Sequence, residues 1–416
     1  MQATNPGEVR IRKFTIDGND FSKLVIRLSI FESTIRPSTV CEVELHDATD
    51  IVNAFRLQGG ELVKVVFETL AIPGLYEADF VLQSLNDSQS LGNLRTQVVR
   101  LTAISAHVME NSKHLVQKSY KDMSAVEVIR DLHYNFLRSS KNIELTSSRG
   151  MVGSSDGHAF IFSQVRPLDA IDTMRRRCSS SVYKSSSYAY FENMNSFFIT
   201  PFEKLMDDAK GKPVAKFHQS VIIGTDIRVD NIRQNFAILV ARETTSTGRT
   251  GRFDTINMVK ALNHETQTWD YRTLSYTSDH GKPKKPSDYK ISGNSPLNDE
   301  KFIAKYSDTT GSQSLIPGDS AKPEQHIKDF SADQMLYMEM LAGGGHQIQV
   351  PMNLNVLAGT GYYANTQSPI GLATQSRQDQ KAGEMLAIKV RHTITVSGVE
   401  PRGMTTIEGV KGGLRT

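Results

Sequence analysis

Two glutamates near the start of the chain have the spacing that acid–base chemistry uses. Glu42 and Glu44 lie two residues apart in a segment that alternates polar and apolar side chains. Both therefore project from the same face of a strand, roughly 6.5–7 Å apart. That separation suits the paired carboxylates of a glycoside hydrolase. Exposed strand faces often carry such pairs, so the sequence favours a wet strand face over a catalytic pair.

The other sequence signals of chemistry are isolated. No GxxxxGK[ST] phosphate loop and no HExxH zinc motif occurs in the sequence. Gly343–Gly345 follow a helical pattern and are interpreted as its C-cap. His392 interrupts the inward face of a late strand, which favours a hydrogen-bonded core or interface histidine over a metal ligand or a base. We therefore predict no catalytic residue, no metal and no cofactor.

Cysteines and basic clusters point to no site either. Cys41 and Cys178 form no CxxC pair, so we expect two unpaired thiols, as in a reducing compartment. Arg175–Arg177 and the Lys282–Lys285 cluster offer fewer cations than the 6–10 phosphate contacts typical of strong nucleic-acid binding. We interpret them as a solvated helix end and a loop.

The composition indicates a globular protein. The chain has 416 residues, 38% of them hydrophobic, and a net charge of +3, which does not predict nucleic-acid binding. The length is typical of two to four domains. No apolar run approaches the ~20 residues that cross a bilayer, and the N-terminus lacks a secretory signal pattern. We expect a soluble protein made without export and without stable membrane insertion.

Alternating strands dominate the elements that position these residues. In residues 1–110 the runs Leu24–Ile30, Cys41–His46 and Leu62–Phe67 alternate in hydrophobicity, and a Gly59-Gly60 turn precedes the last of them. Period-two patterning between turn residues is typical of an antiparallel barrel or sandwich. We predict a first β domain over residues 1–110.

Residues 111–212 are predicted to form an α+β insert. Ser124–Glu127 is a capping box that opens a helix to about residue 138, and Pro167 suits the first turn of a second helix. Tyr188–Glu192 and Phe197–Thr200 flank a short polar turn and predict a hairpin.

A second β domain is predicted after the insert, with its strands interrupted. Its first part is residues 213–274, an irregular excursion follows at 275–330, and a helix and strands complete it over 331–416. The elements expected there are strands at Val221–Val229, Phe302–Tyr306, Ile348–Leu357 and Leu386–Val396, and a helix at Ser331–Leu341.

The order of these segments carries a family resemblance. An acidic β domain leads into Lys118–Ile129, the second helix begins at Arg166–Ile171, and the hairpin carries Tyr188–Phe191. The chain closes with Ile388–His392 and Thr405–Gly409. This order resembles the baseplate hub proteins of contractile-tailed bacteriophages and the hub portion of type VI secretion spike proteins. The resemblance covers most of residues 8–412.

The resemblance implies a mainly β, α+β fold with two tube-protein-like antiparallel β-barrel domains and the α+β insert between them. Three copies would present six barrels, so a homotrimer with pseudo-sixfold symmetry would join the hexameric tail tube to the trimeric central spike. The implied partners are the chain itself, the tail tube ring, a spike on a separate polypeptide, and baseplate wedge or other hub proteins. Phage DNA would pass through the channel without sequence-specific binding. The protein would be made in the host cytoplasm and reside in the virion.

The resemblance also implies a role for polar residues on solvent-exposed strand faces. An acidic strand face lining a channel would repel DNA phosphates. Two alternatives stay open: a tail-associated cell-wall or polysaccharide hydrolase that uses Glu42 and Glu44, and an adhesin-like binding module. The candidates for a lumen-facing surface are Glu42, Glu44, Gln349, Asn353 and Asn355.

Overall fold

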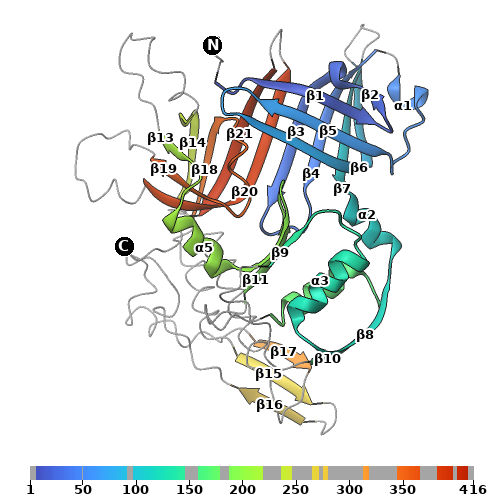
Figure 1. Cartoon of the computed structure of the whole chain (residues 1–416), viewed down its shortest axis with the longest axis vertical. Coiled ribbons are helices and arrows are strands. Elements are labelled where there is room, and N and C mark those ends of the chain that lie inside the picture. Colours follow the sequence, from blue (N-terminus) through green and yellow to red (C-terminus); the bar gives the residue numbers. More distant parts are fainter. Residues whose placement is uncertain are drawn as a thin grey trace, which may run out of the picture.

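Most of the described strands belong to one large sheet (Figure 1). The computed structural model describes residues 6–48, 50–90, 97–145, 158–178, 187–218, 236–245, 265–270, 275–279, 313–317, 344–365, 382–396 and 401–410. The strands of the large sheet are β1 (Val9–Ile16), β2 (Asn19–Asp20), β3 (Val25–Ser33), β4 (Val40–Asp47), β5 (Leu62–Thr69), β6 (Gly74–Ser90), β7 (Gln97–Ser105), β13 (Lys216–His218), β14 (Val240–Thr245), β18 (Gly344–Pro351), β19 (Gly361–Asn365), β20 (Ala382–Val396) and β21 (Pro401–Val410). Their order is β14-β18-β21-β20-β3-β4-β7-β6-β5-β1-β2, and β13 pairs with β19, which pairs with β20.

Strand β20 joins the two ends of the chain. Its later residues pair antiparallel with β3, from Lys389 opposite Ser33 to Thr395 opposite Arg27. Its first residues pair with β19 on the same side, and its other edge pairs with β21. The blue opening strands and the red closing strands accordingly lie side by side in Figure 1. Segments more than 350 residues apart thus share one sheet.

Two isolated bridges lie where this sheet folds back on itself. Glu8, just before β1, bridges Arg402 of β21, and the Gly403 N–H donates to the Gly7 carbonyl at 2.7 Å. At the other end, His218 of β13 bridges Ala237, just before β14. These contacts are single bridges, and no ladder closes a barrel among the described strands.

Each half of the sheet has its own apolar core. In β4, Cys41, Val43 and Leu45 are buried while Glu42 and Glu44 stay partly exposed, as period-two alternation predicts. The opening strands surround one buried cluster that includes Phe14, Ile30 and Phe67. The closing strands surround a second buried cluster, whose members include Phe217, Ile348, Val350, Tyr362, Val390 and Ile407.

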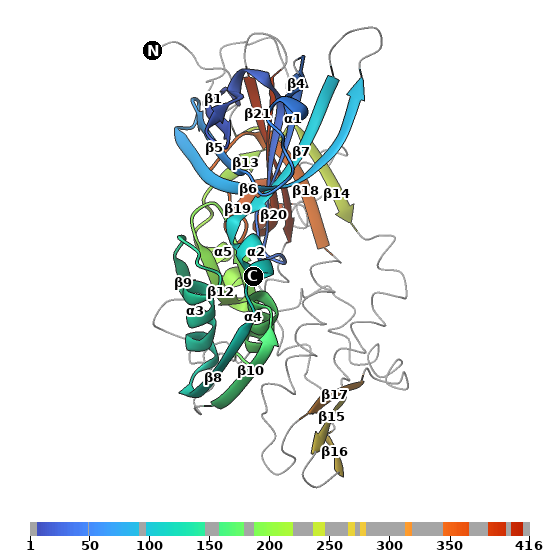
Figure 2. The same ribbon diagram turned by 90° about the vertical axis from the view of Figure 1, so that its right-hand side faces the viewer.

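The middle of the chain forms an α+β unit with a third core. Its capping box is present: Ser124 Oγ accepts from the Glu127 N–H at 3.3 Å, and the Glu127 carboxylate accepts from the Ser124 N–H at 2.9 Å. Pro167 begins the second helix, and the predicted hairpin pairs Tyr188 with Pro201. The elements of this unit, seen from the side in Figure 2, are α2 (Ala106–Lys113), β8 (Val116–Met123), α3 (Ala125–Asn135), β9 (Ile143–Leu145), β10 (His158–Val165), α4 (Pro167–Arg175), β11 (Tyr188–Glu192), β12 (Phe197–Pro201) and α5 (Phe202–Gly211).

The predicted fold class, α+β and mainly β, is confirmed, with some differences in detail. The strand expected over Ile348–Leu357 ends at Pro351. Beyond it, Asn353 Oδ1 accepts the Asn355 N–H at 3.0 Å, a local turn contact that competes with ladder pairing. Helices α2 and α5 were not expected, nor were the short helix α1 (Ile51–Ala54) and the 3₁₀ turn Ser22–Leu24.

The interval expected to be irregular contains two strands of a small sheet. Strand β15 (Glu265–Asp270) pairs with β16 (Ser275–Asp279) and β17 (Gln313–Pro317). The other expected elements, strands at 221–229 and 302–306 and a helix at 331–341, lie outside the described residues. Within the described part of the chain, no helix has both the length and the apolarity to cross a membrane.

Gly361, at the start of β19, lets α5 approach the sheet. An added Cβ would overlap the Ala209 Cα and lie 2.8 Å from the Ala209 carbonyl oxygen. We expect Gly361→Ala to lower the free energy of unfolding by about 2–3 kcal/mol, measured by urea unfolding. In the control Gly18→Ala the added methyl meets no atom within 4 Å and only the positive φ of 81° opposes it, so about 1 kcal/mol is expected. Equal losses at the two positions would contradict the packing argument.

Candidate functional site

Polar side chains from neighbouring strands gather on one face of the large sheet. Directly opposed residues of an antiparallel ladder project to the same face. Glu42 lies opposite Ser29 of β3 and Thr102 of β7. Glu44 lies opposite Arg100 of β7. The two predicted glutamates therefore point away from the core, together with these cross-strand neighbours.

The same face continues across β20, β21 and β18. Ser29 lies opposite Thr393, and Arg391, two residues earlier, shares its face. Arg391 lies opposite Thr406, which lies opposite Gln349. The sheet thus brings Gln349 onto the face that carries the two glutamates. We call this surface the polar sheet face; its residues are Arg27, Ser29, Glu42, Glu44, Arg100, Thr102, Arg242, Gln347, Gln349, Lys389, Arg391, Thr393, Thr395, Arg402, Thr406 and Glu408.

The two other predicted residues lie beyond the end of β18. Asn353 is only 1% exposed, and its backbone N–H donates to Thr405 Oγ1 at 3.0 Å. Asn355 is exposed in the turn that follows. The alternation in the sequence continues past Pro351, but the strand does not, so the structure does not place Asn353 and Asn355 on the polar sheet face.

Cations outnumber carboxylates on the polar sheet face. Arg100 Nη2 donates to Glu44 at 2.8 Å, and Lys389 Nζ donates to Glu408 at 2.6 Å. The expectation of an acidic face rested on one strand alone, whereas the other strands contribute mainly basic residues. The cations are Arg27, Arg100, Arg242, Lys389, Arg391 and Arg402, and the carboxylates are Glu42, Glu44 and Glu408.

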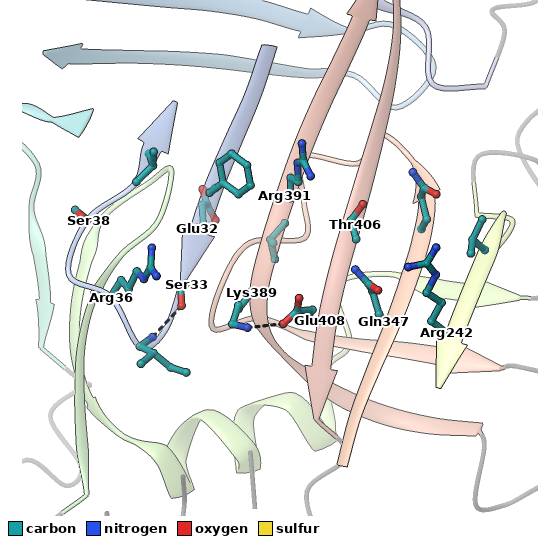
Figure 3. Close-up of a pocket in the computed structure, with 16 residues that line it drawn as sticks. Glu32, Ser33, Arg36, Ser38, Arg242, Gln347, Lys389, Arg391, Thr406 and Glu408 are labelled. Atoms are coloured by element: carbon teal, nitrogen blue, oxygen red, sulfur yellow. Dashed lines mark hydrogen bonds and ion pairs between the residues drawn. The ribbon is translucent and has the colours of Figure 1, made fainter. Parts of the chain in front are cut away.

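A groove of about 660 Å³ lies on this face, bounded by the turn between β3 and β4. Figure 3 shows Arg36 of that turn and Arg242 of β14 at opposite ends, with Lys389 and Arg391 of β20 between them. We call it the sheet groove. It is lined by Phe31, Glu32, Ser33, Ile35, Arg36, Ser38, Val40, Val240, Arg242, Gln347, Gln349, Lys389, Val390, Arg391, Thr406 and Glu408.

Arg391 is held in place at the centre of the groove. Its guanidinium carbon lies 4.8 Å from the centre of the Phe31 ring, a cation–π geometry. Its Nη2 donates to Ser29 Oγ at 3.3 Å, while its Nε is buried and has no hydrogen-bond partner among the described residues. Burial lowers the pKa of Arg391 and the charge of Arg27 lowers it further, while the charges of Glu42 and Glu44 raise it.

His392 belongs to the core. It is fully buried, and its Nδ1 lies 3.0 Å from Thr405 Oγ1. Burial lowers the pKa of His392 to about 4, so the ring is neutral at pH 7. The preferred interpretation as a hydrogen-bonded core histidine is confirmed. The described residues contain no group of three or more His, Cys, Asp or Glu arranged to hold a metal ion.

The two cysteines are buried in the fold, and two arginines of Arg175–Arg177 contact other parts of the protein. Cys41 and Cys178 are buried free thiols, and burial raises the pKa of Cys178 to about 12. Arg175 Nη1 donates to the Tyr188 carbonyl at 2.6 Å, and the Arg177 guanidinium lies 4.5 Å from the Phe160 ring centre. A solvated helix end was expected, but Arg175 and Arg177 at this helix end contact the protein.

Glu192, at the end of β11, ties the α+β unit to the opening strands. It is 2% exposed. Its carboxylate accepts from the Thr39 N–H at 2.8 Å, from Ser105 Oγ at 2.5 Å and from Lys141 Nζ at 2.7 Å. Burial by itself raises the pKa of Glu192, but the charges of Lys141 and His107 and these hydrogen bonds outweigh it and lower the pKa overall.

Glu32, on β3, makes a second buried connection. It is also 2% exposed and accepts from the Met194 N–H at 2.7 Å and from the Ala358 N–H at 3.0 Å. Burial raises the pKa of Glu32 to about 7, against the opposing effects of the two backbone N–H groups and of Lys141. We call Glu32, Glu192 and their partners the buried junction, because it links the opening strands, the α+β unit and the segment before β19.

Sequence reasoning missed the buried junction, although a signal was present. Glu32 continues the inward series of Leu28 and Ile30 in β3, and Glu192 ends the wholly buried aromatic strand that begins at Tyr188. A carboxylate at an inward position of an alternating strand is costly to bury unless it is hydrogen-bonded. Such a residue therefore indicates a partner from elsewhere in the fold.

Two solved structures share this architecture over nearly the whole chain. A tail protein from Neisseria meningitidis MC58 aligns over 98% of this chain and 97% of its own, at 11% identity and a TM-score of 0.56. The 43 kDa tail protein of prophage MuSo2 from Shewanella oneidensis aligns over 98% of both chains, at 10% identity and a TM-score of 0.54. No protein-family model and no curated protein sequence matches the chain.

At these identities the likeness concerns the fold. The chain shares the fold of these two tail proteins over nearly its whole length. The resemblance that the segment order predicted is confirmed at this level.

Proposed function

We propose that this protein is the structural baseplate hub of a contractile phage tail. As a homotrimer with pseudo-sixfold symmetry it joins the hexameric tail tube to the trimeric central spike and resides in the virion, and it has no enzymatic role. The observation that carries the proposal is the fold shared with two tail proteins, one of them from a prophage, across 98% of the chain.

Pseudo-sixfold symmetry requires two similar modules in each chain, and two features support them. The opening and closing strands each surround a separate apolar core. One bridge joins the start of β1 to β21, Glu8 to Arg402, and another joins β13 to the residue before β14, His218 to Ala237. We therefore propose two barrel-like modules. Residues 1–110 belong to the first, and residues 213–274 and 331–416 to the second, whose strands β20 and β21 also complete the first. The insert 111–212 and the excursion 275–330 lie outside both.

The polar sheet face is our candidate for the channel wall. Glu42, Glu44 and Gln349 lie on it and are partly exposed, as a wetted wall requires. The buried Asn353 is left out of this surface. In this arrangement phage DNA passes the wall transiently, and the tail tube ring, the spike and the wedge or other hub proteins contact the ends and outside of the trimer.

The assembly is tested on the purified chain, alone and with the spike protein from the same phage. We expect light scattering to give three times the 46.3 kDa mass of one chain, and negative-stain images to show a ring with a central hole. Images of the intact particle should place a label on this chain at the tail axis. A monomer in both preparations, or a label away from the axis, contradicts the proposal.

The hydrolase alternative is tested in the same preparation. We expect the purified chain to leave cell-wall and polysaccharide substrates intact, and Glu42→Gln and Glu44→Gln to change nothing. Clearing of the substrate by the native chain that is abolished by Glu42→Gln would establish a hydrolase and refute the purely structural role.

A further inference from the structure

The described lining of the sheet groove contains more basic than acidic side chains. Lys389 is paired with Glu408 at 2.6 Å. No described carboxylate lies within ion-pair distance of Arg36, Arg242 or Arg391, although all three line the same groove. Three arginines therefore face a shared volume with an excess of hydrogen-bond donors.

Arg391 is oriented before any ligand arrives. Its stacking on Phe31 and its bond to Ser29 restrict the guanidinium, while the buried Nε lacks an acceptor. A buried donor without a partner costs free energy that an incoming acceptor recovers. The planar fork of a guanidinium matches the two oxygens of a carboxylate.

We propose that the sheet groove binds a carboxylate-bearing polypeptide segment of a partner protein, with Arg391 as its central contact and Arg36 and Arg242 at the two ends. Backbone and apolar atoms of the segment pack on the apolar part of the lining. That part includes Ile35, Val40 and Val240.

The lining favours an acidic peptide over a nucleic acid. The groove has fewer cations than the 6–10 phosphate contacts typical of strong nucleic-acid binding, and Glu408 and Glu32 are also part of its lining. Its volume of about 660 Å³ falls within the range of pockets that enclose a small ligand. That volume suits a few side chains of an extended segment, whereas a duplex is too wide to enter it.

The identity of the partner rests on the proposed function in one respect. If the polar sheet face lines the channel, the segment belongs to a protein on the axis of the assembly. Binding of an acidic peptide by the isolated chain does not depend on trimer formation, so failure of either proposal can be recognised separately.

The test uses the full chain and a fluorescein-labelled hexaglutamate peptide, with binding followed by fluorescence anisotropy at low salt. Hexaglutamine and a six-nucleotide oligothymidine are the comparison probes. We expect Arg391→Gln to weaken hexaglutamate binding roughly tenfold, and Arg391→Lys several-fold because it keeps the charge but loses the fork. Arg36→Gln and Arg242→Gln should each weaken it about threefold.

Arg402→Gln is the matched control, since Arg402 is exposed on β21 but does not line the groove. Its affinity should change less than about twofold, and circular dichroism should show all variants folded. Equal losses in Arg402→Gln and Arg391→Gln would refute the proposal, as would equal binding of hexaglutamine. Tighter binding of the oligonucleotide through the same arginines would also overturn it, and would make the groove a nucleic-acid surface.

Discussion

Replacing Glu192 by alanine is expected to lower the free energy of unfolding by about 3–5 kcal/mol. The carboxylate accepts from Thr39, Ser105 and Lys141, and it is 2% exposed. Its removal leaves buried donors without an acceptor and Lys141 without its counter-charge. Because domains are typically stable by only 5–15 kcal/mol, this single change removes a large part of the total.

Glu144 provides the matched control for this variant. It lies in the same α+β unit and its carboxylate accepts from Ser196 Oγ at 3.0 Å, but its side chain is exposed. Glu144→Ala should cost less than about 0.5 kcal/mol. Urea unfolding followed by circular dichroism measures both variants. A Glu192→Ala loss no larger than the Glu144→Ala loss would show that the buried junction does not stabilise the fold.

The second large effect is a pH dependence that originates at Glu32. Its pKa rises from an ordinary 4.5 to about 7 in the folded chain. A carboxyl whose pKa is raised by folding stabilises the fold fully below pH 4.5, and this stabilisation is lost as the pH rises through 7. The unfolding free energy of the native chain minus that of Glu32→Gln should therefore fall by about 3 kcal/mol between pH 4.5 and pH 7.5.

The difference between native and variant chains is the quantity to measure, because buried histidines act in the opposite direction. Burial lowers the pKa of His392 to about 4, and also lowers those of His107 and His133. Their stabilisation is present above pH 6.5 and is lost as the pH falls. Both chains retain these histidines, so subtraction isolates Glu32. A difference that stays constant with pH would contradict the raised pKa.

The buried junction also bears on the proposed assembly. Glu192 links the α+β unit to the opening strands, and Glu32 links those strands to the Ala358 N–H before β19. In the proposed hub these contacts would hold the three parts in a fixed relation. Glu192→Ala is thus expected to reduce the yield of rings in negative stain along with the stability of the chain.

The sequence alone determined the local elements and the fold class. Alternation set the strands around Cys41 and Leu62, a capping box set the start of α3, and Pro167 set the start of α4. These signals act within one turn of helix or one strand, so neighbouring residues are sufficient to specify them. The order of the segments was also sufficient to predict the phage tail fold.

Only the tertiary structure decided which strands pair and which side chains meet on their common face. The pairing of β3 with β20 joins residues more than 350 positions apart, and nothing in either strand alone specifies its partner. That pairing gives the polar sheet face its excess of cations, creates the groove around Arg391, and leaves Asn353 in a buried turn. Charge and burial at these positions are properties of the assembled sheet, because each depends on side chains that distant segments supply.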